Sequence, residues 1–290
     1  MGTIKTILLT GATGYLGSRL LDKLFREDYA VCIIKRKSSS LKQIEALKGN
    51  YKLYDNDEES IERLFFENKI DLVIHMATAY GRKGESILEI KSANLDFPLL
   101  ILKNAVANNV KYFINTGTSL PYLANLYSLF KNQFSECLEF FSAQITSVNV
   151  LLEHFYGPGD DDTKFITAMI RKMKSNVADI PLTAGIQIRD FIFVDDVLDA
   201  YFAIIANLNR FSGYTNLPLG SGEGVTIRKI VENIKRQSKS TSDLQFGAVA
   251  MRENELMKSD ADISLLKELG WSPKYTLEKG LKITIDSIKI

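Results

Sequence analysis

The chain has 290 residues, of which 46% are hydrophobic, and its formal net charge is +1. This length allows one large α/β domain or a domain with an additional lobe, and the small charge excludes a global field that would attract nucleic acid or a membrane surface. With two cysteines (Cys32 and Cys137), two histidines and no CxxC motif, we expect free thiols in a reducing compartment and no metal site. No apolar run approaches the roughly 18 residues of a membrane span, and the first residues lack the pattern of a signal peptide, so we expect a cytoplasmic protein.

The first half of the chain alternates short apolar runs with helical patterns. Strands are predicted at Thr6–Thr10, Ala30–Lys35, Tyr51–Tyr54, Leu72–His75, Tyr112–Thr116 and Ser147–Leu152, and helices at 15–27, 41–48, 58–68, 87–108 and about 126–142. Segments such as "DLVIHMA" and "YFINTG" are apolar through their middles, which is typical of strands buried on both faces. The pattern therefore predicts an α/β fold with a doubly wound, Rossmann-type parallel sheet.

The regular alternation of strand and helix patterns ends after about residue 155, where "FYGPGDDD" indicates a loop. Further helices are predicted at 163–174, 195–207, 226–237 and 262–268, mixed with short extended pieces. We therefore predict a nucleotide-binding core of residues 1–155, to which 190–213 return, and a smaller mixed α/β lobe of residues 156–189 and 214–290. A cleft between the two is the expected ligand site.

The segment "TGATGYLG" places three glycines between the first strand and the first helix. Gly11 would allow the sharp turn, Gly14 would let backbone N–H groups approach a pyrophosphate, and Gly17 would let the helix pack closely on the strand. The anion would lie at the positive end of the helix that begins near Tyr15. A plain tight turn is the alternative, and the position within a βαβ unit favours dinucleotide binding.

The end of the second strand, about 20 positions further on, indicates which dinucleotide binds. It reads "IIKRKSSS", with Lys35, Arg36 and Ser38 and without the carboxylate typical of NAD binding. Arg36 can pair bidentately with a 2′-phosphate and stack on adenine. A solvated basic turn is the alternative, and we predict NADPH as the cofactor.

Catalytic chemistry is indicated by "INTGTSLPYLANLYSLFK". Tyr127 and Lys131 have the i, i+4 spacing that places two side chains on one face of a helix. A nearby ammonium favours the tyrosine phenolate, so Tyr127 could exchange a proton near neutral pH. Thr118 follows the fifth strand and could bind the same substrate oxygen. The alternative is an exposed tyrosine and lysine on a surface helix.

These motifs together resemble the extended short-chain dehydrogenase/reductase family of nucleotide-sugar epimerases, dehydratases and reductases. The resemblance rests on "TGATGYLG", "YSLFK", "FYGPG", "IRDFIFVDDVLDAY", "YTNLPLGSGEGVTIRKIVENI" and "LKELGWSPKYTLEKGLKITI", in that order, and spans residues 3–286. It implies a homodimer that forms through the 87–108 and 126–142 helices. Within the family, the short "TGTSLPYLANLYSLFKNQF" is most similar to the CDP-sugar reductases of O-antigen synthesis, the abequose and paratose synthases.

The resemblance also helps to choose among the family's reactions. Ser119 and Leu120 stand where sugar dehydratases carry an Asp-Glu pair, and Arg36 stands where NAD-dependent epimerases usually carry an acidic residue. Cys137, an acid/base candidate in some members, is interpreted as a buried structural thiol. The remaining reaction is NADPH-dependent reduction of the C4 keto group of a nucleotide-activated 6-deoxy or 3,6-dideoxy sugar. A 4-epimerase with bound NAD and a non-catalytic NADP-binding protein stay open as alternatives.

The predicted site has three sets of residues. The catalytic set is Thr118, Tyr127 and Lys131. The cofactor set is Gly11, Thr13, Gly14, Tyr15, Leu16, Gly17, Lys35, Arg36, Ser38, Asp55, Ala77, Tyr127 and Lys131. The substrate set is Thr78, Ser119, His154, Lys164, Phe165, Arg189 and Arg252. By resemblance His154 faces the substrate phosphates, and Arg189 and Arg252 lie near the diphosphate. Asp195 and Asp196 are interpreted as a helix cap and first-turn charge, without a catalytic role.

Overall fold

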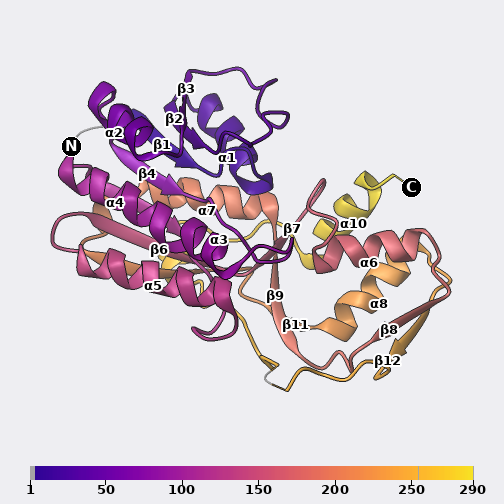
Figure 1. Cartoon of the computed structure of the whole chain (residues 1–290). Coiled ribbons are helices and arrows are strands. Elements are labelled where there is room, and N and C mark those ends of the chain that lie inside the picture. Colours follow the sequence, from indigo (N-terminus) through magenta and orange to yellow (C-terminus); the bar gives the residue numbers. More distant parts are fainter. Residues whose placement is uncertain (1–3, 254, 290) are drawn as a thin grey trace. The chain divides into compact units, whose positions relative to one another are not determined.

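The computed structural model describes residues 4–253 and 255–289 (Figure 1). The chain divides into two compact units: unit 1 comprises 1–151 and 205–217, and unit 2 comprises 152–204 and 218–290. The predicted division differs from this one, because it assigned 152–155 and 190–204 to the core and 214–217 to the lobe.

Unit 1 is built on the seven-stranded sheet, in the order β10-β6-β5-β4-β1-β2-β3. The strands are β1 Thr6–Thr10, β2 Ala30–Lys35, β3 Tyr51–Asp55, β4 Leu72–His75, β5 Tyr112–Thr116, β6 Thr146–Leu152 and β10 Tyr214–Leu219. The pairs from β3 through β1 and β4 to β6 are parallel. The strand order reverses between β1 and β4, which is where doubly wound sheets bind their ligands. The predicted α/β fold class is confirmed.

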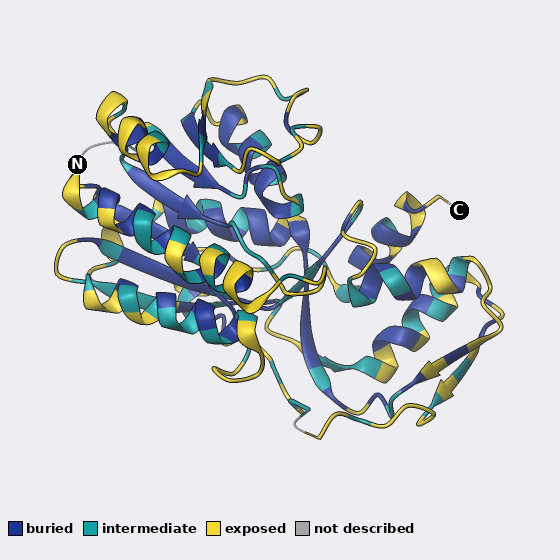
Figure 2. Cartoon of the chain, viewed as in Figure 1, coloured by how far each residue is buried: buried dark blue, intermediate teal, exposed yellow. Residues whose placement is uncertain are grey.

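Helices cover the sheet of unit 1, and Figure 2 shows buried strands beside helices with exposed outer faces. The helices are α1 Tyr15–Arg26, α2 Glu58–Glu67, α3 Ile87–Lys91, α4 Phe97–Ala107 and α5 Leu126–Phe140. One core joins α2, α4 and α5 to the sheet through side chains such as Leu8, Val73 and Phe113, which are all fully buried. The apolar strand middles thus have the double-sided burial that their sequence predicts.

Two predicted helices differ from the structure. Residues 41–48 form turns, with hydrogen bonds such as Ile44 N to Leu41 O, because the segment buries only Ile44 and short helices without packing are marginal. The predicted 87–108 helix is divided into α3, a π-helical turn at Ser92–Asp96, and α4. Pro98 follows the wider turn, and its missing N–H cannot continue a regular α-helical ladder.

Unit 2 has its own core between helices and two small sheets. Its elements are β7 His154–Tyr156, α6 Phe165–Lys174, β8 Asp179–Leu182, β9 Ile188–Phe193, α7 Val194–Ala206, β11 Gly224–Thr226, α8 Ile227–Ser238, β12 Asp243–Phe246, α9 Ser264–Glu268 and α10 Leu277–Ser287. The sheets have the orders β11-β9-β7 and β12-β8. Buried side chains of α6, α8 and α10, among them Ile170, Ile234 and Leu281, pack together in this core.

Candidate active site

The glycine loop joins β1 to α1 with a geometry that only glycine permits at two positions. Gly11 has φ +72°, and a Cβ there would lie 2.7 Å from the backbone nitrogen of Ala77. A Cβ on Gly17 would lie 2.1 Å from the carbonyl oxygen of Gly11. Gly14 is the exposed N-cap of α1, no side chain caps that end, and no acidic residue lies in the first turn. These features fit a pyrophosphate at the helix N-terminus.

The other predicted cofactor residues around the loop have different surroundings. Thr13 is half-buried, and Leu16 is buried in the core. Tyr15 begins α1, and the guanidinium of Arg19 lies 4.0 Å from the centre of its ring. Ala77 lies against Gly11, so the loop and the end of β4 form one surface.

Thr10 and His75 hold the ends of β1 and β4 together, a feature that the sequence analysis missed. The Thr10 hydroxyl accepts hydrogen bonds from the backbone N–H groups of Met76 and Ala77, each at 3.2 Å. Its own proton is therefore donated to His75 Nδ1, 2.8 Å away, which leaves the imidazole proton on Nε2. Desolvation, and then the charge of Lys131, hold the pKa of His75 well below its ordinary value, so this histidine is a neutral structural group.

The basic end of β2 is partly neutralised by β3. Lys35 Nζ lies 2.8 Å from Asp55 Oδ1, so two of the predicted cofactor residues are engaged with one another. Arg36 and Ser38 are exposed in a turn closed by the hydrogen bond from Ser39 N to Arg36 O. The Arg36 guanidinium is thus accessible at the place where the adenosine ribose would lie.

The predicted catalytic residues come together in unit 1. Asn125 caps α5 through a hydrogen bond from Ser128 N to its Oδ1, 2.9 Å, and this fixes the first turn, which carries Tyr127. The Tyr127 hydroxyl lies near the side-chain hydroxyls of Thr118 and Thr78, which both lower the pKa of the tyrosine. Because Thr118 Oγ1 accepts from Leu120 N at 3.2 Å, its proton is available for the tyrosine or for a substrate oxygen.

Lys131 lies one turn further along α5, and only 2% of it is exposed. Its Nζ donates to the Thr116 carbonyl at 2.9 Å, and desolvation lowers the pKa of Lys131 to about 7. Desolvation, followed by the nearby Tyr80, raises the pKa of Tyr127, while the hydroxyls of Thr118 and Thr78 lower it. The sequence analysis expected the ammonium to favour the phenolate. The protein alone does not show this effect, because burial dominates the pKa of both groups.

Asn94 is a second site residue that the sequence analysis missed. Both of its Nδ2 protons are donated, to the carbonyls of Ala79 (2.8 Å) and Ile90 (2.9 Å). Its Oδ1 accepts the hydroxyl proton of Thr78 at 2.8 Å. Asn94 therefore holds the Thr78 hydroxyl in a fixed orientation. The predicted substrate residue Thr78 is thus placed beside the Tyr127 hydroxyl.

A second aromatic ring lies next to the ring of Tyr127, tilted against it. The ring of Tyr80 lies 5.0 Å from that of Tyr127, and the Arg82 guanidinium lies 5.2 Å from the Tyr80 ring. The charge of Arg82 also lowers the pKa of Tyr127. Both residues come shortly after β4, in "ATAYGRK". Their position after the carboxyl end of a parallel strand could have marked them in the sequence as candidate site residues.

The predicted substrate residues of unit 2 are engaged to different degrees. Arg189 is buried and forms an ion pair with Glu255 at 2.6 Å. Lys164 lies 3.0 Å from Asp160 Oδ1. Arg252 is exposed, and Phe165 begins α6. His154 lies beside the buried Glu153, and Ser119, the one further member of this set in unit 1, is half-buried.

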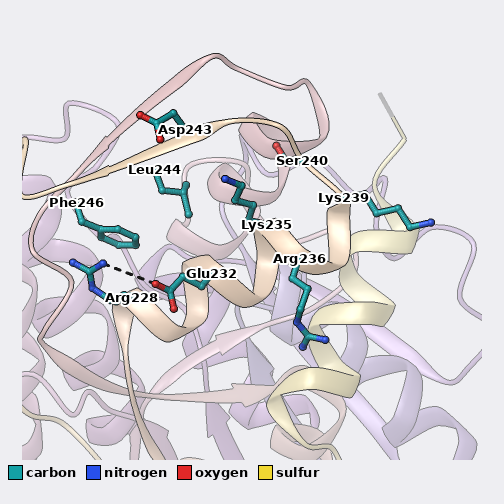
Figure 3. A pocket seen from close by; sticks show the side chains of 9 residues that line it. All are labelled: Arg228, Glu232, Lys235, Arg236, Lys239, Ser240, Asp243, Leu244 and Phe246. Carbon is teal, nitrogen blue, oxygen red and sulfur yellow. Dashed lines mark ion pairs between the residues drawn. The ribbon is translucent and has the colours of Figure 1, made fainter.

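Unit 2 also carries a basic groove along α8 and β12 that contains none of the predicted site residues (Figure 3). Its lining residues are Arg228, Glu232, Lys235, Arg236, Lys239, Ser240, Asp243, Leu244 and Phe246. Within the described part of the chain, no group of His, Cys, Asp and Glu side chains could hold a metal ion. None of the described helices is long and apolar enough to cross a membrane.

A parallel sheet with a glycine loop at its switch point and a Thr-Tyr-Lys set beside the next strands defines a protein of the short-chain dehydrogenase/reductase class. The chain belongs to the NAD dependent epimerase/dehydratase family, whose sequence profile matches residues 7–217.

Comparison with individual proteins gives similarity along most of the chain. The chain is 33% identical over 291 residues to the CDP-abequose synthase of Salmonella typhimurium, and the alignment covers 95% of this chain and 96% of that one. It is 25% identical to a UDP-glucose 4-epimerase of Caenorhabditis elegans, covering 94% of each. The solved UDP-glucose 4-epimerase of Thermotoga maritima superposes with a TM-score of 0.84 at 24% identity, covering 97% of this chain and 98% of that one. That structure has the same fold.

Proposed function

We propose that this chain is an NADPH-dependent reductase of the C4 keto group of a nucleotide-activated 6-deoxy or 3,6-dideoxy hexose. A CDP-sugar is favoured, as a precursor for O-antigen polysaccharide. The observation that carries this proposal is the Thr118, Tyr127 and Lys131 set within one unit, with the tyrosine hydroxyl in contact with Thr118. The similarity to CDP-abequose synthases along nearly the whole chain supports the choice of substrate.

Each side chain has one role in the proposed reaction. NADPH, when bound, supplies a hydride to the ketone carbon. Tyr127 donates its proton to the ketone oxygen, and Thr118 donates a hydrogen bond to the same oxygen. Lys131, fixed by the Thr116 carbonyl, supplies the positive charge beside the tyrosine and binds the nicotinamide ribose. The glycine loop binds the pyrophosphate, and Arg36 binds the 2′-phosphate.

The direct test is NADPH oxidation by the purified protein against CDP-, dTDP-, GDP- and UDP-4-keto-sugars. We expect absorbance loss at the reduced-nicotinamide band with one nucleotide class, strongest for CDP, and a C4 alcohol as product. Absence of NADPH consumption with all four classes would overturn the proposed reductase function.

The role of Tyr127 is tested by Tyr127→Phe. Loss of a positioned general acid should lower kcat by about 10²–10⁴-fold while NADPH affinity stays unchanged. The control is Tyr122→Phe, which alters an exposed tyrosine just before α5 and should leave kcat unchanged. Full turnover of Tyr127→Phe would show that another group donates the proton.

A 4-epimerase with resident NAD is the second candidate, favoured by the match to the family profile and by the similarity to UDP-glucose 4-epimerases. Mass spectrometry of the cofactor released from denatured protein separates the two. Tightly held NAD, together with interconversion of a UDP-sugar and no net NADPH consumption, would support the epimerase.

A further inference from the structure

Glu153 is a buried carboxylate between β6 and β7 in unit 2. It is 6% exposed, and its backbone N–H donates to the Leu219 carbonyl at 2.9 Å. Its Oε1 accepts the Ser259 hydroxyl proton at 2.6 Å. Its Oε2 is also buried, and it has no hydrogen-bond partner among the described residues. A buried carboxylate oxygen without a partner is costly, so its surroundings call for a donor.

The next residue carries a nitrogen that can serve as that donor. His154 Nδ1 is likewise buried without a hydrogen-bond partner in the described ranges, and it lies 3.6 Å from Glu153 Oε2. The His154 side chain is nevertheless 40% exposed. Its Nδ1 edge is therefore the buried edge, and part of the ring is accessible from outside. A donor and an acceptor that face one another across 3.6 Å need only a small side-chain rotation to form a hydrogen bond.

The other charged side chains of the neighbouring segments are already engaged. Arg189 on β9 pairs with Glu255, and Lys258, which bridges to Ile188 of β9, pairs with Asp260 at 3.1 Å. Asp190 on β9 accepts hydrogen bonds from Ser221. Within residues 4–253 and 255–289, His154 is the basic side chain that the structure places beside the Glu153 carboxylate.

We propose that Ser259 and Glu153 are positioning residues that fix the His154 ring with its proton on Nδ1, so that Nε2 is the nitrogen offered to a ligand. A carboxylate at one ring nitrogen decides the tautomer, and Ser259 holds that carboxylate in place. In the proposed complex the ring carries a proton on each nitrogen, so that Nδ1–H donates to Glu153 and Nε2–H donates to a phosphate oxygen, and the charged ring lies between two anions. The ligand identity rests on the proposed function, which supplies a nucleoside diphosphate.

His154 lies beside Phe191, and so does the start of α6. The His154 ring lies 5.3 Å from that of Phe191, which in turn lies 6.5 Å from Phe165 at the start of α6. The N-terminus of α6 has no side-chain cap and no acidic residue in its first turn. Free backbone N–H groups at a helix start attract phosphates. The histidine and the helix start thus lie near one another in unit 2.

The tautomer is measurable because the chain has only two histidines. Nitrogen-15 NMR of histidine-labelled full-length protein should show His154 protonated at Nδ1 and His75 at Nε2, with His154→Ala giving the assignment. In Glu153→Gln the His154 proton should move to Nε2, while His75 stays unchanged as internal control. A His154 that carries its proton on Nε2 in the native protein, or that is insensitive to Glu153→Gln, overturns the inference.

Ser259→Ala provides a second variant in case Glu153→Gln does not fold, because it removes only the anchor of the carboxylate. It should lower the fraction of the Nδ1–H tautomer of His154. An unchanged tautomer would show that Ser259 has no positioning role.

Calorimetric titration with CDP tests the ligand. Glu153→Gln and His154→Ala should each weaken CDP binding about tenfold or more, and the double variant should lose no more than His154→Ala alone, because Glu153 acts through the histidine. The control Glu223→Gln, at an exposed glutamate, should leave CDP binding unchanged. Additive losses, or no loss, overturn the inference. Because neither readout uses a keto-sugar, a failed NADPH assay would refute the proposed function and leave this inference standing.

Discussion

Lys131 shows how one side chain can lower the stability of a fold for the sake of its site. It is 2% exposed, and its surroundings lower its pKa from 10.5 to about 7. Between these two values the unfolded chain binds more protons at this residue than the folded chain does. Stability therefore rises with pH across this window, and the cost of burying the lysine is complete below pH 7 and absent above pH 10.5.

We expect Lys131→Met to stabilise the protein without cofactor in acid and not in alkali. The gain at pH 6 should be at most on the order of 5 kcal/mol and should disappear as the pH approaches 10.5. Urea unfolding at pH 6, 8 and 10 measures it, with Lys229→Met at an exposed lysine of α8 as control. A stability difference that is constant with pH would contradict the buried-ammonium explanation.

Arg36 decides the cofactor in the proposed function. Because Lys35 is engaged with Asp55, the exposed Arg36 is expected to supply the contact with the 2′-phosphate. Arg36→Ala should raise the Kd for NADPH about 10- to 100-fold with little change for NADH, as expected for a charge-assisted hydrogen bond. Fluorescence titration with both cofactors measures this, and Lys37→Ala is the neighbouring control. Equal losses for NADPH and NADH would exclude 2′-phosphate recognition.

The residues of the candidate site were predictable only where local spacing marked them. Tyr127 and Lys131 lie one turn apart, so the sequence alone placed them on one helix face. Asn94 and Tyr80 were missed, because their roles depend on contacts with Thr78 and Tyr127 from other parts of the chain. A side chain that acts through a non-local partner leaves no periodic signal.

At the scale of elements, the glycines of the β1–α1 junction have two different roles, one in packing and one in cofactor binding. Gly17 is needed where α1 touches the backbone of Gly11, whereas Gly14 is exposed at the helix end. The two glycines should therefore respond differently to an added methyl group, although they are three residues apart.

We expect Gly17→Ala to destabilise the protein by at least about 1–3 kcal/mol and to abolish NADPH binding, since its Cβ would lie 2.1 Å from Gly11 O. Gly14→Ala meets that oxygen at 3.3 Å with φ −88° and should fold almost normally while NADPH binding weakens. Thermal unfolding and NADPH fluorescence measure the two effects. If both variants fold and bind alike, the assigned division of roles is wrong.

Helix prediction succeeded where a face is buried and failed where burial is small or the backbone is interrupted. The α1 and α5 patterns bury several side chains each, and both helices form within a few residues of their predicted bounds. The 41–48 segment buries too little to form a helix, and the helix predicted at 87–108 contains a π-helical turn. The spacing of apolar residues predicts neither the absence of a helix at 41–48 nor the π-helical turn within 87–108.

At the scale of the whole molecule, two helices of unit 1 each carry an exposed large apolar side chain. Leu88 is 71% exposed on α3, and Phe140 is 80% exposed on α5. The homodimer that the sequence resemblance predicts through these two helices would cover both side chains.

The double variant Leu88→Glu, Phe140→Glu should be monomeric in sedimentation equilibrium at micromolar concentration, whereas the native chain should be dimeric. The new glutamates of the two copies would be buried close together at the interface, and the repulsion between their like charges would oppose association. Phe66→Glu alters the 90% exposed Phe66 of α2 and should leave the dimer intact. A monomeric native chain would refute the predicted dimer.

The sequence by itself determined the sheet, the glycine loop and the spacing of Tyr127 and Lys131, because apolar runs, glycine requirements and helix periodicity are local properties of a chain. Tertiary structure decided which charges are available. It paired Lys35 with Asp55 and Arg189 with Glu255, and it brought Ser259 to the buried carboxylate of Glu153. Ion pairs and desolvation depend on what the fold brings within a few ångströms, and linear spacing does not specify that.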